Sequence, residues 1–345
     1  MSDENLSVRK KEHLDICSDN RAMFKQKTNG FENYDFIHCA DTEVIIDEID
    51  LSTQFFNKKI SFPFFISCMT GGTDKADNIN LELAFAAQQT GIPLGLGSIR
   101  YAIEDGGSFE NIVEIKKVAS TIPVLGNIGA AQILSKKNQK KLVEILSETG
   151  LDAMVIHLNP LQELLQKEGE PSFGELLKSI ERFIKKINVP LVVKEVGSGI
   201  SKQTAERLLD AGVKGIDVAG AGGTSWAAVE LIRNKKDYSE FWDWGLPTSY
   251  CIRTVAELKK KYKFTLIGSG GINSPFDSAK AMALGSDLTA SARKILHQLN
   301  QNGVEGVIDF INDWFNDIKK IMFLTGSKSL KDFNKQKIIL KKELH

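Results

Sequence analysis

Short apolar runs alternate with amphipathic stretches along most of the chain, from about residue 61 onward. The repeat is roughly 25–35 residues long, enough for one strand, one helix and their two connections. The runs have little polar interruption, as fully buried parallel strands require. This pattern predicts eight strands, at Phe64–Cys68, Leu94–Gly97, Val124–Asn127, Met154–Leu158, Leu191–Glu195, Gly215–Ala219, Thr265–Ser269 and Leu288–Ser291.

Between the predicted strands lie stretches with the 3.6-residue period of amphipathic helices. Gly91, Gly150, Gly212 and Gly285 follow four of them, where a left-handed residue commonly ends a helix. Eight parallel strands joined by crossover helices close into a barrel, so we predict an α/β protein with the (β/α)8 TIM-barrel fold. The predicted helices are Asn78–Thr90, Glu110–Ala119, Lys136–Glu148, Gly174–Lys186, Lys202–Ala211, Thr248–Lys261 and Pro275–Leu284.

The segment before the repeat, residues 1–60, is predicted to be an extension added to a barrel of residues 61–300. Leu6–Ser18 can form an amphipathic helix. Asp41–Leu51 alternates enough to predict an early hairpin strand that covers the floor or flank of the barrel.

The segment after the repeat, residues 301–345, is predicted to be helical. Gly306–Leu324 is strongly amphipathic and would close the outer ring of helices, and the lysine-rich Lys328–His345 is predicted to be a last helix. The longest interruption within the repeat, Asn234–Pro247, carries aromatic residues without a clean helical period. Because loops of this length are usually functional, we predict a lid or an oligomer contact there.

Composition narrows the class of protein. Lys+Arg 44 balances Asp+Glu 44 over 345 residues, so no global field favours nucleic acid or an anionic membrane. No apolar run approaches the ~20 residues of a membrane span, and the polar N-terminus does not resemble a signal peptide. The four cysteines lie far apart, which favours a reduced, cytoplasmic compartment. These are Cys17, Cys39, Cys68 and Cys251.

The stretch AMVIHLNPLQE, residues 153–163, carries the densest candidate chemistry. It opens as a buried strand and Pro160 prevents the strand from continuing. An imidazole, two amides and a carboxylate then follow, which is typical of the wall of a site; the alternative is a polar loop that satisfies itself at the sheet edge. The four side chains are His157, Asn159, Gln162 and Glu163.

Glycines follow the predicted seventh strand, and Ser291-Ala292-Arg293 follows the eighth. In TIM barrels this pair of strand ends commonly forms a phosphate site, because bare backbone amides lead into helix N-termini. Gly270-Gly271-Ile272 therefore predicts a phosphate cradle, with Gly222-Gly223-Thr224 as another side of it. The alternative is that the glycines only permit tight turns.

Lys194 lies inside the apolar strand PLVVKEV, and an unpaired buried ammonium is costly. A Schiff-base carbonyl, a ligand anion and an electron-rich ring edge are all plausible partners, as is a structural pair with Glu195 or Glu163. Asn127, on a neighbouring strand, would complement a ring that displays carbonyl and N–H groups. Met69-Thr70-Gly71-Gly72 could lay its backbone along a planar ring or could be a plain turn.

Three basic residues of the N-terminal helix share one face. Arg9 and His13 are spaced i,i+4 and Lys10 and His13 are spaced i,i+3, so their charges can converge on one anion. The alternative is an ordinary solvated basic face.

Together these residues resemble one family, the flavin-dependent type 2 isopentenyl-diphosphate Δ-isomerases. The resemblance runs in order through nearly the whole chain, and HLNPLQE together with VKEVGSGIS is its most specific part. The matching motifs are Arg9-Lys10-x-x-His13, MTGG (69–72), GLGSIR (95–100), GNIGA (126–130), HLNPLQE (157–163), VKEVGSGIS (193–201), AGAGGTSW (219–226), GLPT (245–248) and GSGGI (268–272).

The resemblance implies a single FMN-binding barrel domain over residues 1–345, with NADPH as reductant, Mg²⁺, a diphosphate substrate and assembly as a homo-oligomer, a tetramer or octamer. It implies a magnesium ligand at Glu163, and catalytic roles for Gln162, Lys194 and His157. Glu230 matches a further acidic group less securely. The FMN positions are Met69, Thr70, Gly71, Ser98, Asn127, Lys194, Thr224, Gly270, Gly271 and Ala292; the substrate positions are Arg9, Lys10, His13, Ser98, Arg100, Asn159 and Gln162.

Two departures from the family pattern are visible. Ile99 stands where many members have glutamine, which removes one polar contact. Ala290-Ser291 replaces the commoner glycine-hydrophobic pair and leaves backbone cradling intact.

The implied reaction interconverts isopentenyl and dimethylallyl diphosphate by proton addition and elimination. No His/Asp dyad is evident in the sequence, so a cofactor that carries the proton is reasonable. We hypothesise that reduced FMN, poised by Lys194, protonates the terminal alkene carbon at N5. The same flavin, or Gln162 through its neighbourhood, would assist loss of the allylic proton.

Three other readings remain. An FMN-dependent 2-hydroxy-acid oxidase needs a histidine base near the end of the seventh strand, and none of the five histidines is placed there. A dehydrogenase of the IMP type needs a nucleophilic cysteine after the sixth strand, and residues 220–226 contain none. A barrel that only binds phosphate ligands would be colourless.

Overall fold

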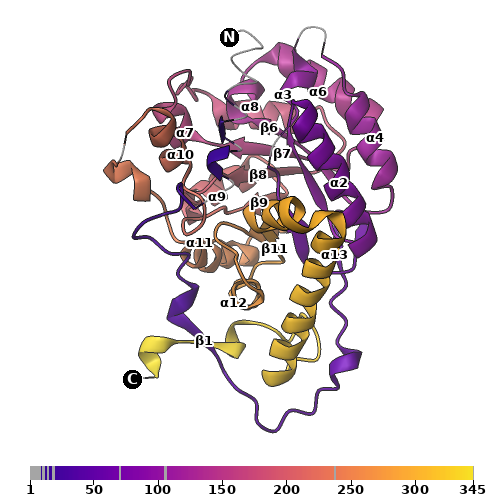
Figure 1. The fold of residues 1–345 in the computed structure, drawn as a ribbon, viewed down its shortest axis with the longest axis vertical. Coiled ribbons are helices and arrows are strands. Elements are labelled where there is room, and N and C mark those ends of the chain that lie inside the picture. Colours follow the sequence, from indigo (N-terminus) through magenta and orange to yellow (C-terminus); the bar gives the residue numbers. More distant parts are fainter. Residues whose placement is uncertain are drawn as a thin grey trace.

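The chain folds around a closed barrel of eight parallel strands (Figure 1). The structure is a computed structural model, and it describes residues 9, 12–13, 15–17, 20–69, 71–104, 107–236 and 238–344. Each barrel strand pairs with the next, and the last closes on the first. The predicted TIM barrel and all eight predicted strands are confirmed. They are β4 (Phe64–Ile66), β5 (Leu94–Ser98), β6 (Val124–Gly129), β7 (Ala153–Leu158), β8 (Leu191–Glu195), β9 (Gly215–Asp217), β10 (Thr265–Gly268) and β11 (Leu288–Ser291).

Alternation along each strand separates the barrel interior from the helix layer. On β8, Val192 packs in a small interior cluster with residues of the other strands, whereas Leu191 and Val193 belong to the large cluster shared with the helices. Lys194 is two residues beyond Val192 and therefore faces the interior. The interior layer of side chains that contains Lys194 lies nearer the carboxyl ends of the strands than the apolar cluster, and this layer is polar.

A hairpin closes the amino end of the barrel. It consists of β2 (Thr53–Phe55) and β3 (Lys58–Ile60), and Phe55 and Ile60 join the interior cluster. The prediction of a hairpin strand at Asp41–Leu51 is wrong, because that segment contains the 3-10 turn η2 (Ile46–Glu48) and a single bridge from Asp50 to Ser329. Val44, Ile49 and Leu51 instead belong to the large buried cluster, and Ile45 is exposed.

Helices cover the outside of the barrel (Figure 1). Four serines cap helix N-termini by accepting a backbone N–H, as expected for this residue type; they are Ser135, Ser201, Ser225 and Ser274. The seven helices predicted between the strands are all present within a few residues. The described helices of the barrel are α2 (Asp74–Thr90), α3 (Arg100–Ile103), α4 (Glu110–Val118), α5 (Ala130–Ile133), α6 (Lys136–Thr149), α7 (Pro160–Leu165), α8 (Leu176–Ile184), α9 (Lys202–Asp210), α10 (Trp226–Arg233), α11 (Thr248–Val255) continued by η4 (Ala256–Lys260), and α12 (Pro275–Ala283).

Four of these helices are absent from the predicted set: α3, α5, α7 and α10. Two of them, α7 and α10, matter for the candidate site. Pro160 ends β7 as expected but also begins α7, because proline is well suited to the first position of a helix. Both short helices carry side chains of the candidate site, and they contact one another.

The C-terminal part combines one long helix with a strand. α13 (Arg293–Leu324) contains the predicted amphipathic stretch and bends at Gly303, which has φ 66°. The prediction of a last helix at Lys328–His345 is wrong. The chain there forms β12 (Ile338–Leu340), antiparallel to β1 (Tyr34–Phe36), flanked by the turns η5 (Lys335–Lys337) and η6 (Lys341–Glu343).

The segment predicted as a lid, Asn234–Pro247, is fastened to residues 23–27. The Trp242 indole donates to the Met23 carbonyl at 2.8 Å, and Asp243 Oδ1 accepts from the Lys25 N–H at 2.9 Å. It contains η3 (Glu240–Asp243), and another turn, η1 (Phe31–Asn33), follows the N-terminal segment. A role as a lid or oligomer contact stays a prediction.

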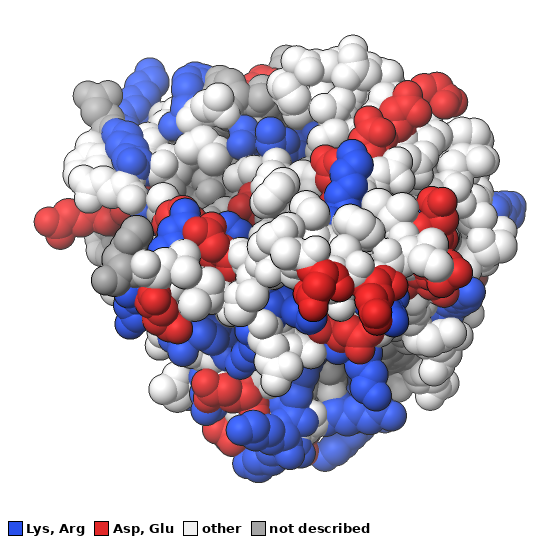
Figure 2. Space-filling model, turned by 90° about the horizontal axis from the view of Figure 1, so that it is seen from below, with Lys and Arg blue, Asp and Glu red and all other residues white. Residues whose placement is uncertain are grey.

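The surface carries both signs of charge. Figure 2 shows acidic and basic side chains interspersed on the face seen from below, with several basic ones gathered along its lower edge. Among the described residues, none of the helices combines the length and the apolar character that crossing a bilayer demands.

Candidate active site

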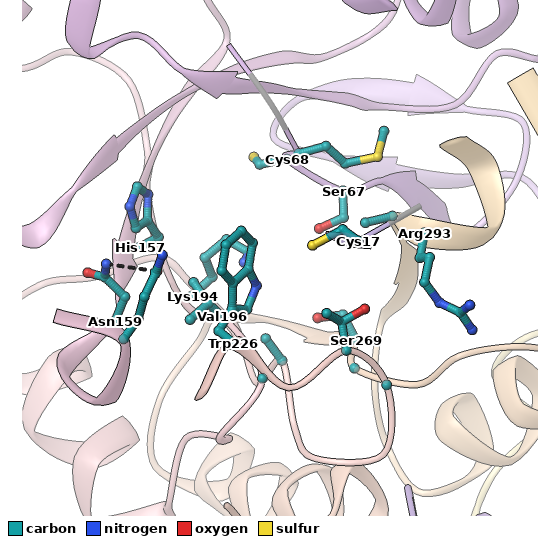
Figure 3. Close-up of a pocket in the computed structure, with 18 of the residues that line it drawn as sticks. Cys17, Ser67, Cys68, His157, Asn159, Lys194, Val196, Trp226, Ser269 and Arg293 are labelled. Atoms are coloured by element: carbon teal, nitrogen blue, oxygen red, sulfur yellow. Dashed lines mark hydrogen bonds between the residues drawn. The ribbon is translucent and has the colours of Figure 1, made fainter. Parts of the chain in front are cut away.

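A cavity of about 310 Å³ opens at the carboxyl ends of the barrel strands. The strand-end residues on opposite sides face each other across it, with His157 and Lys194 on one side and Ser67 and Arg293 on the other (Figure 3). Of the predicted site residues, Lys10 and Thr70 lie outside the described residues. All the other predicted site residues line this cavity. They are Arg9, His13, Met69, Gly71, Ser98, Arg100, Asn127, His157, Asn159, Gln162, Glu163, Lys194, Thr224, Gly270, Gly271 and Ala292.

The predicted phosphate cradle requires its glycines. Gly270 and Gly271 have φ of 95° and 68°, a region that L side chains rarely adopt. A Cβ on Gly271 would also lie 2.5 Å from the Gly222 carbonyl. Side chains hold the loop, since Asn29 Nδ2 donates to the Gly271 carbonyl at 2.7 Å and Thr248 Oγ1 donates to the Gly270 carbonyl at 2.6 Å. Bare backbone is thus presented to the cavity at the position where such barrels bind phosphate.

His157 contributes a polar but uncharged side chain to the interior wall of the cavity. Its Nδ1 lies 3.0 Å from Asn127 Oδ1, an acceptor, so Nδ1 carries the proton and Nε2 keeps its lone pair. Burial, and then the neighbouring Lys194 charge, lower the pKa of His157 to about 3. At neutral pH this side chain is an uncharged hydrogen-bonding group.

Lys194 forms no ion pair with Glu195 or Glu163 in the part of the chain that the structure describes. Its Nζ donates to the Glu195 carbonyl at 2.7 Å. The Glu195 carboxylate is occupied elsewhere, because Oε2 accepts the N–H groups of Val196 and Gly197 at 2.6 Å each, and also that of Ser198. Burial raises the pKa of Glu195, and these donors oppose the shift. Lys194 therefore keeps capacity for a ligand.

A buried carboxylate organises the side chains around α7 and His13. Glu230, on α10, has a fully buried side chain whose Oε1 lies 2.9 Å from His13 Nε2 and accepts from Gln162 Nε2 at 3.0 Å. Arg233 NH1 donates to Oε2 at 2.6 Å. Burial raises the pKa of Glu230, but the donors from His13, Gln162 and Arg233 outweigh burial and leave the pKa lowered. The carboxylate is therefore ionised and its orientation is fixed.

The Gln162 amide is held at both ends. Its Nε2 donates to Glu230 and its Oε1 accepts from Asn159 Nδ2 at 3.1 Å. The sequence only weakly indicated Glu230, and it gave no sign of the His13–Glu230 pair, whose members are separated by 217 residues. The edge-to-face contact of His13 with Trp226, with ring centroids 5.2 Å apart, was equally unforeseen.

Two guanidinium groups stand at one side of the cavity. Burial and the nearby Arg100 charge lower the pKa of Arg9, and Arg9 Nε has no hydrogen-bond partner among the described residues. Arg100 Nε donates to Glu104 at 2.9 Å. An unpartnered buried donor beside a second cation fits an anion with several oxygens.

Glu163 stands alone as a candidate metal ligand. Its Oε1 accepts from Asn159 Nδ2 at 3.0 Å and its Oε2 accepts from the Glu170 N–H at 2.9 Å. Among the described residues no group of three metal-binding side chains occurs. A lone carboxylate fits Mg²⁺, which usually keeps waters and takes further ligands from phosphate oxygens.

The barrel, the glycine cradle and the neutral polar wall define a TIM-barrel protein of the flavin-binding type. The sequence profile described as FMN-dependent dehydrogenase matches residues 2–158 and 131–340. Solved structures share the fold at low identity. A flavocytochrome b2 mutant with bound pyruvate has a TM-score of 0.72 at 18% identity, covering 96% of this chain and 82% of that one. A mandelate oxidase mutant has a TM-score of 0.67 at 17% identity, covering 98% and 99%.

Closer relatives share the whole length. The isopentenyl-diphosphate delta-isomerase of Chlorobium limicola is 41% identical over 358 residues, covering 99% of both chains. That of Pseudescherichia vulneris is 41% identical over 346 residues, covering 98% of both. The chain belongs to the isopentenyl-diphosphate delta-isomerase family, within the FMN-dependent dehydrogenase group.

Proposed function

We propose that the protein is an FMN-dependent isomerase that interconverts isopentenyl diphosphate and dimethylallyl diphosphate. One observation carries the proposal. A single cavity joins a glycine cradle, a polar ring-binding wall around Asn127 and Lys194, and a cationic side around Arg9 and Arg100. A cofactor phosphate, its ring and a second anionic ligand each have a matching surface.

The FMN-binding role divides among three groups of residues. The phosphate would be held by the backbone of Gly270, Gly271 and Ala292. A Cβ at either glycine would clash with neighbouring backbone, so the glycines leave their N–H groups accessible to phosphate oxygens. Asn127 and Lys194 would hold the polar edge of the ring, and Met69 and Gly71 would lie along it. When bound in its reduced form, FMN supplies the acid–base chemistry of the alkene without net oxidation.

The chain's own acid–base groups lie beside the alkene site. Gln162 would be fixed against the five-carbon tail by Asn159 and Glu230. The ionised Glu230 accepts from His13 Nε2 and Gln162 Nε2 at Oε1 and so holds both side chains at the site. His157 offers a neutral Nε2 as an acceptor. Trp226 lines the cavity here, and its ring contacts the His13 ring edge to face.

The diphosphate would lie between Arg9, His13 and Arg100, with Lys10 and Ser98 as further contacts. Glu163 would bind Mg²⁺ jointly with the diphosphate, so the metal site would be complete only with substrate. NADPH is proposed as the reductant of the cofactor. A cytoplasmic location and assembly as a tetramer or octamer also stay proposals.

The test is product analysis. Purified protein with FMN, NADPH, Mg²⁺ and isopentenyl diphosphate should form dimethylallyl diphosphate, and Gln162→Ala and Glu163→Ala should reduce the rate by at least tenfold. A 5-deazaflavin that supports full turnover would disprove the proton-transfer role of the cofactor.

The same preparation separates the other readings. Oxidation of a 2-hydroxy acid without isomerisation would identify an oxidase, although the residues that follow β10, Ser269-Gly270-Gly271, include no histidine base. A colourless protein that does not bind FMN would leave only a phosphate-binding barrel.

A further inference from the structure

Asp217 occupies the same interior layer of the barrel as Lys194. The two residues are register partners on the adjacent parallel strands β8 and β9, and side chains of register partners point to the same face of a sheet. Asp217 has no exposed surface. The sequence analysis did not single it out, because Gly-Ile-Asp at the end of a strand carries no motif.

The carboxylate of Asp217 is only half satisfied. Its Oδ1 accepts from Ser269 Oγ at 2.5 Å, and Ser269 itself lines the cavity. Its Oδ2 is buried and has no hydrogen-bond partner among the described residues. Burial raises the pKa of Asp217, and the Lys194 charge is the strongest of the influences that oppose the shift, ahead of Ser269 and the Ala219 backbone. A buried carboxylate with a spare oxygen is costly unless a cation compensates it.

Other carboxylates do not serve Lys194 in this way. Glu195 follows Lys194 on the strand and so points to the opposite face, where backbone N–H groups occupy it. Glu163 contacts Asn159 and the Glu170 backbone. In the described interior layer, Asp217 is thus the negative charge that offsets the Lys194 ammonium.

We propose that Asp217 is a positioning residue that keeps the Lys194 ammonium directed at the polar edge of the FMN ring. Reduction adds negative charge to that edge of a flavin, so a fixed ammonium there stabilises the reduced cofactor more than the oxidised one. Asp217 does not contact the ligand cavity directly and acts through Lys194 and Ser269. Without the Asp217 carboxylate, the Lys194 ammonium would lose the opposite charge that fixes its direction.

The experiment compares the affinities of reduced and oxidised FMN, using the midpoint potential of the bound cofactor. Asp217→Asn keeps an oxygen for Ser269 and removes the charge. We expect about a tenfold smaller preference for reduced FMN, equivalent to about 30 mV in the two-electron potential. In a Lys194→Met background the same substitution should produce no further change, because the double-mutant cycle isolates an effect carried by Lys194.

A matched control is Asp152→Asn, at the other end of the barrel. Asp152 bridges Lys58 at 2.7 Å and Lys116 at 2.5 Å, so its loss should affect stability and leave the potential unchanged. If Asp217→Asn does not fold, Asp217→Ser leaves room for a water and should give the same shift. Equal losses of affinity for both redox states, or an undiminished shift in the Lys194→Met background, would overturn the inference.

The inference rests on FMN binding in the proposed site, and the two failures are distinguishable. If the unsubstituted protein binds no FMN, the proposed function fails. If it binds FMN but Asp217→Asn leaves the potential unchanged, only the role of Asp217 is wrong.

Discussion

Replacing Glu230 by glutamine tests whether one buried carboxylate holds the substrate wall together. Glutamine has the shape of glutamate but only one acceptor oxygen. In the protein, Glu230 Oε1 accepts hydrogen bonds from His13 and Gln162, and Oε2 accepts one from Arg233. In Glu230→Gln one of these oxygens becomes an NH2 group, which must then face a hydrogen-bond donor. The Arg233 side chain, which is 9% exposed, also loses its buried counter-charge; its remaining acidic partners among the described residues are Glu12 and Glu168.

The expected cost follows from these contacts. Breaking a buried charge pair by removing one partner typically costs ~3–5 kcal/mol, and the retained shape and the partners left to Arg233 place the estimate at the lower end, ~3 kcal/mol. For a chain of this length the unfolding entropy near 60 °C is roughly 0.7 kcal/mol/K, so the melting temperature should fall by about 4 °C. The effect on catalysis should be larger, because Gln162 and His13 lose their shared anchor.

The assay is thermal unfolding at several pH values, followed by the isomerase rate. The pKa of Glu230 is lowered in the folded protein from its ordinary 4.5, so its contribution is full above about pH 4.5 and is lost as the pH falls through the lowered value. The difference between the two proteins should therefore be constant near neutrality and shrink in acid. Glu257→Gln is the control, since its pair with Lys202 is solvent-exposed and should not matter measurably. If the melting temperature of Glu230→Gln equals that of Glu257→Gln, the reasoning is refuted.

Three further outcomes are expected. Gly271→Ala should weaken FMN binding by at least tenfold in a fluorescence titration, because Gly271 has φ 68° and a Cβ there would meet the Gly222 carbonyl. The control is Gly150→Ala, where φ is 67° but the surrounding space is open; it should lower the free energy of unfolding by roughly 1 kcal/mol and leave FMN binding intact. The pKa of His157 is lowered to about 3, so wild type should lose stability as the pH falls from 6.5 toward 3, and His157→Asn should flatten that dependence in acid melting curves; an unchanged slope would show that His157 is not buried as a neutral ring. Glu163→Gln should raise the Mg²⁺ concentration needed for half-maximal rate by about tenfold while FMN affinity stays the same, and an unaltered Mg²⁺ dependence would remove Glu163 from the metal site.

The strands and most helices follow from local pattern because each is a short-range property. The run at Leu191–Glu195 is apolar because both faces of a barrel strand are buried, and Gly91 and Gly150 end helices because the backbone there turns left-handed. The failures also have a local cause. Ile338–Leu340 becomes a strand only because Tyr34–Phe36 lies beside it, and no feature within the lysine-rich tail specifies that partner.

The site divides along the same line. The strand-end positions of Asn127, Lys194 and Gly271 could be predicted because parallel barrel strands deliver their carboxyl ends to one face. The pairing of His13 with Glu230 could not, since it joins residues 217 positions apart that only the tertiary structure brings together.

By itself, then, the sequence determined the eightfold alternation, the glycines that leave backbone bare and the polar residues that end each strand. Only the tertiary structure decided which charges meet. Strand register put Asp217 beside Lys194, and helix packing put Glu230 under Gln162. The physical reason is that hydrophobic periodicity is encoded residue by residue, whereas a buried charge acquires its partner only when distant segments exclude water together.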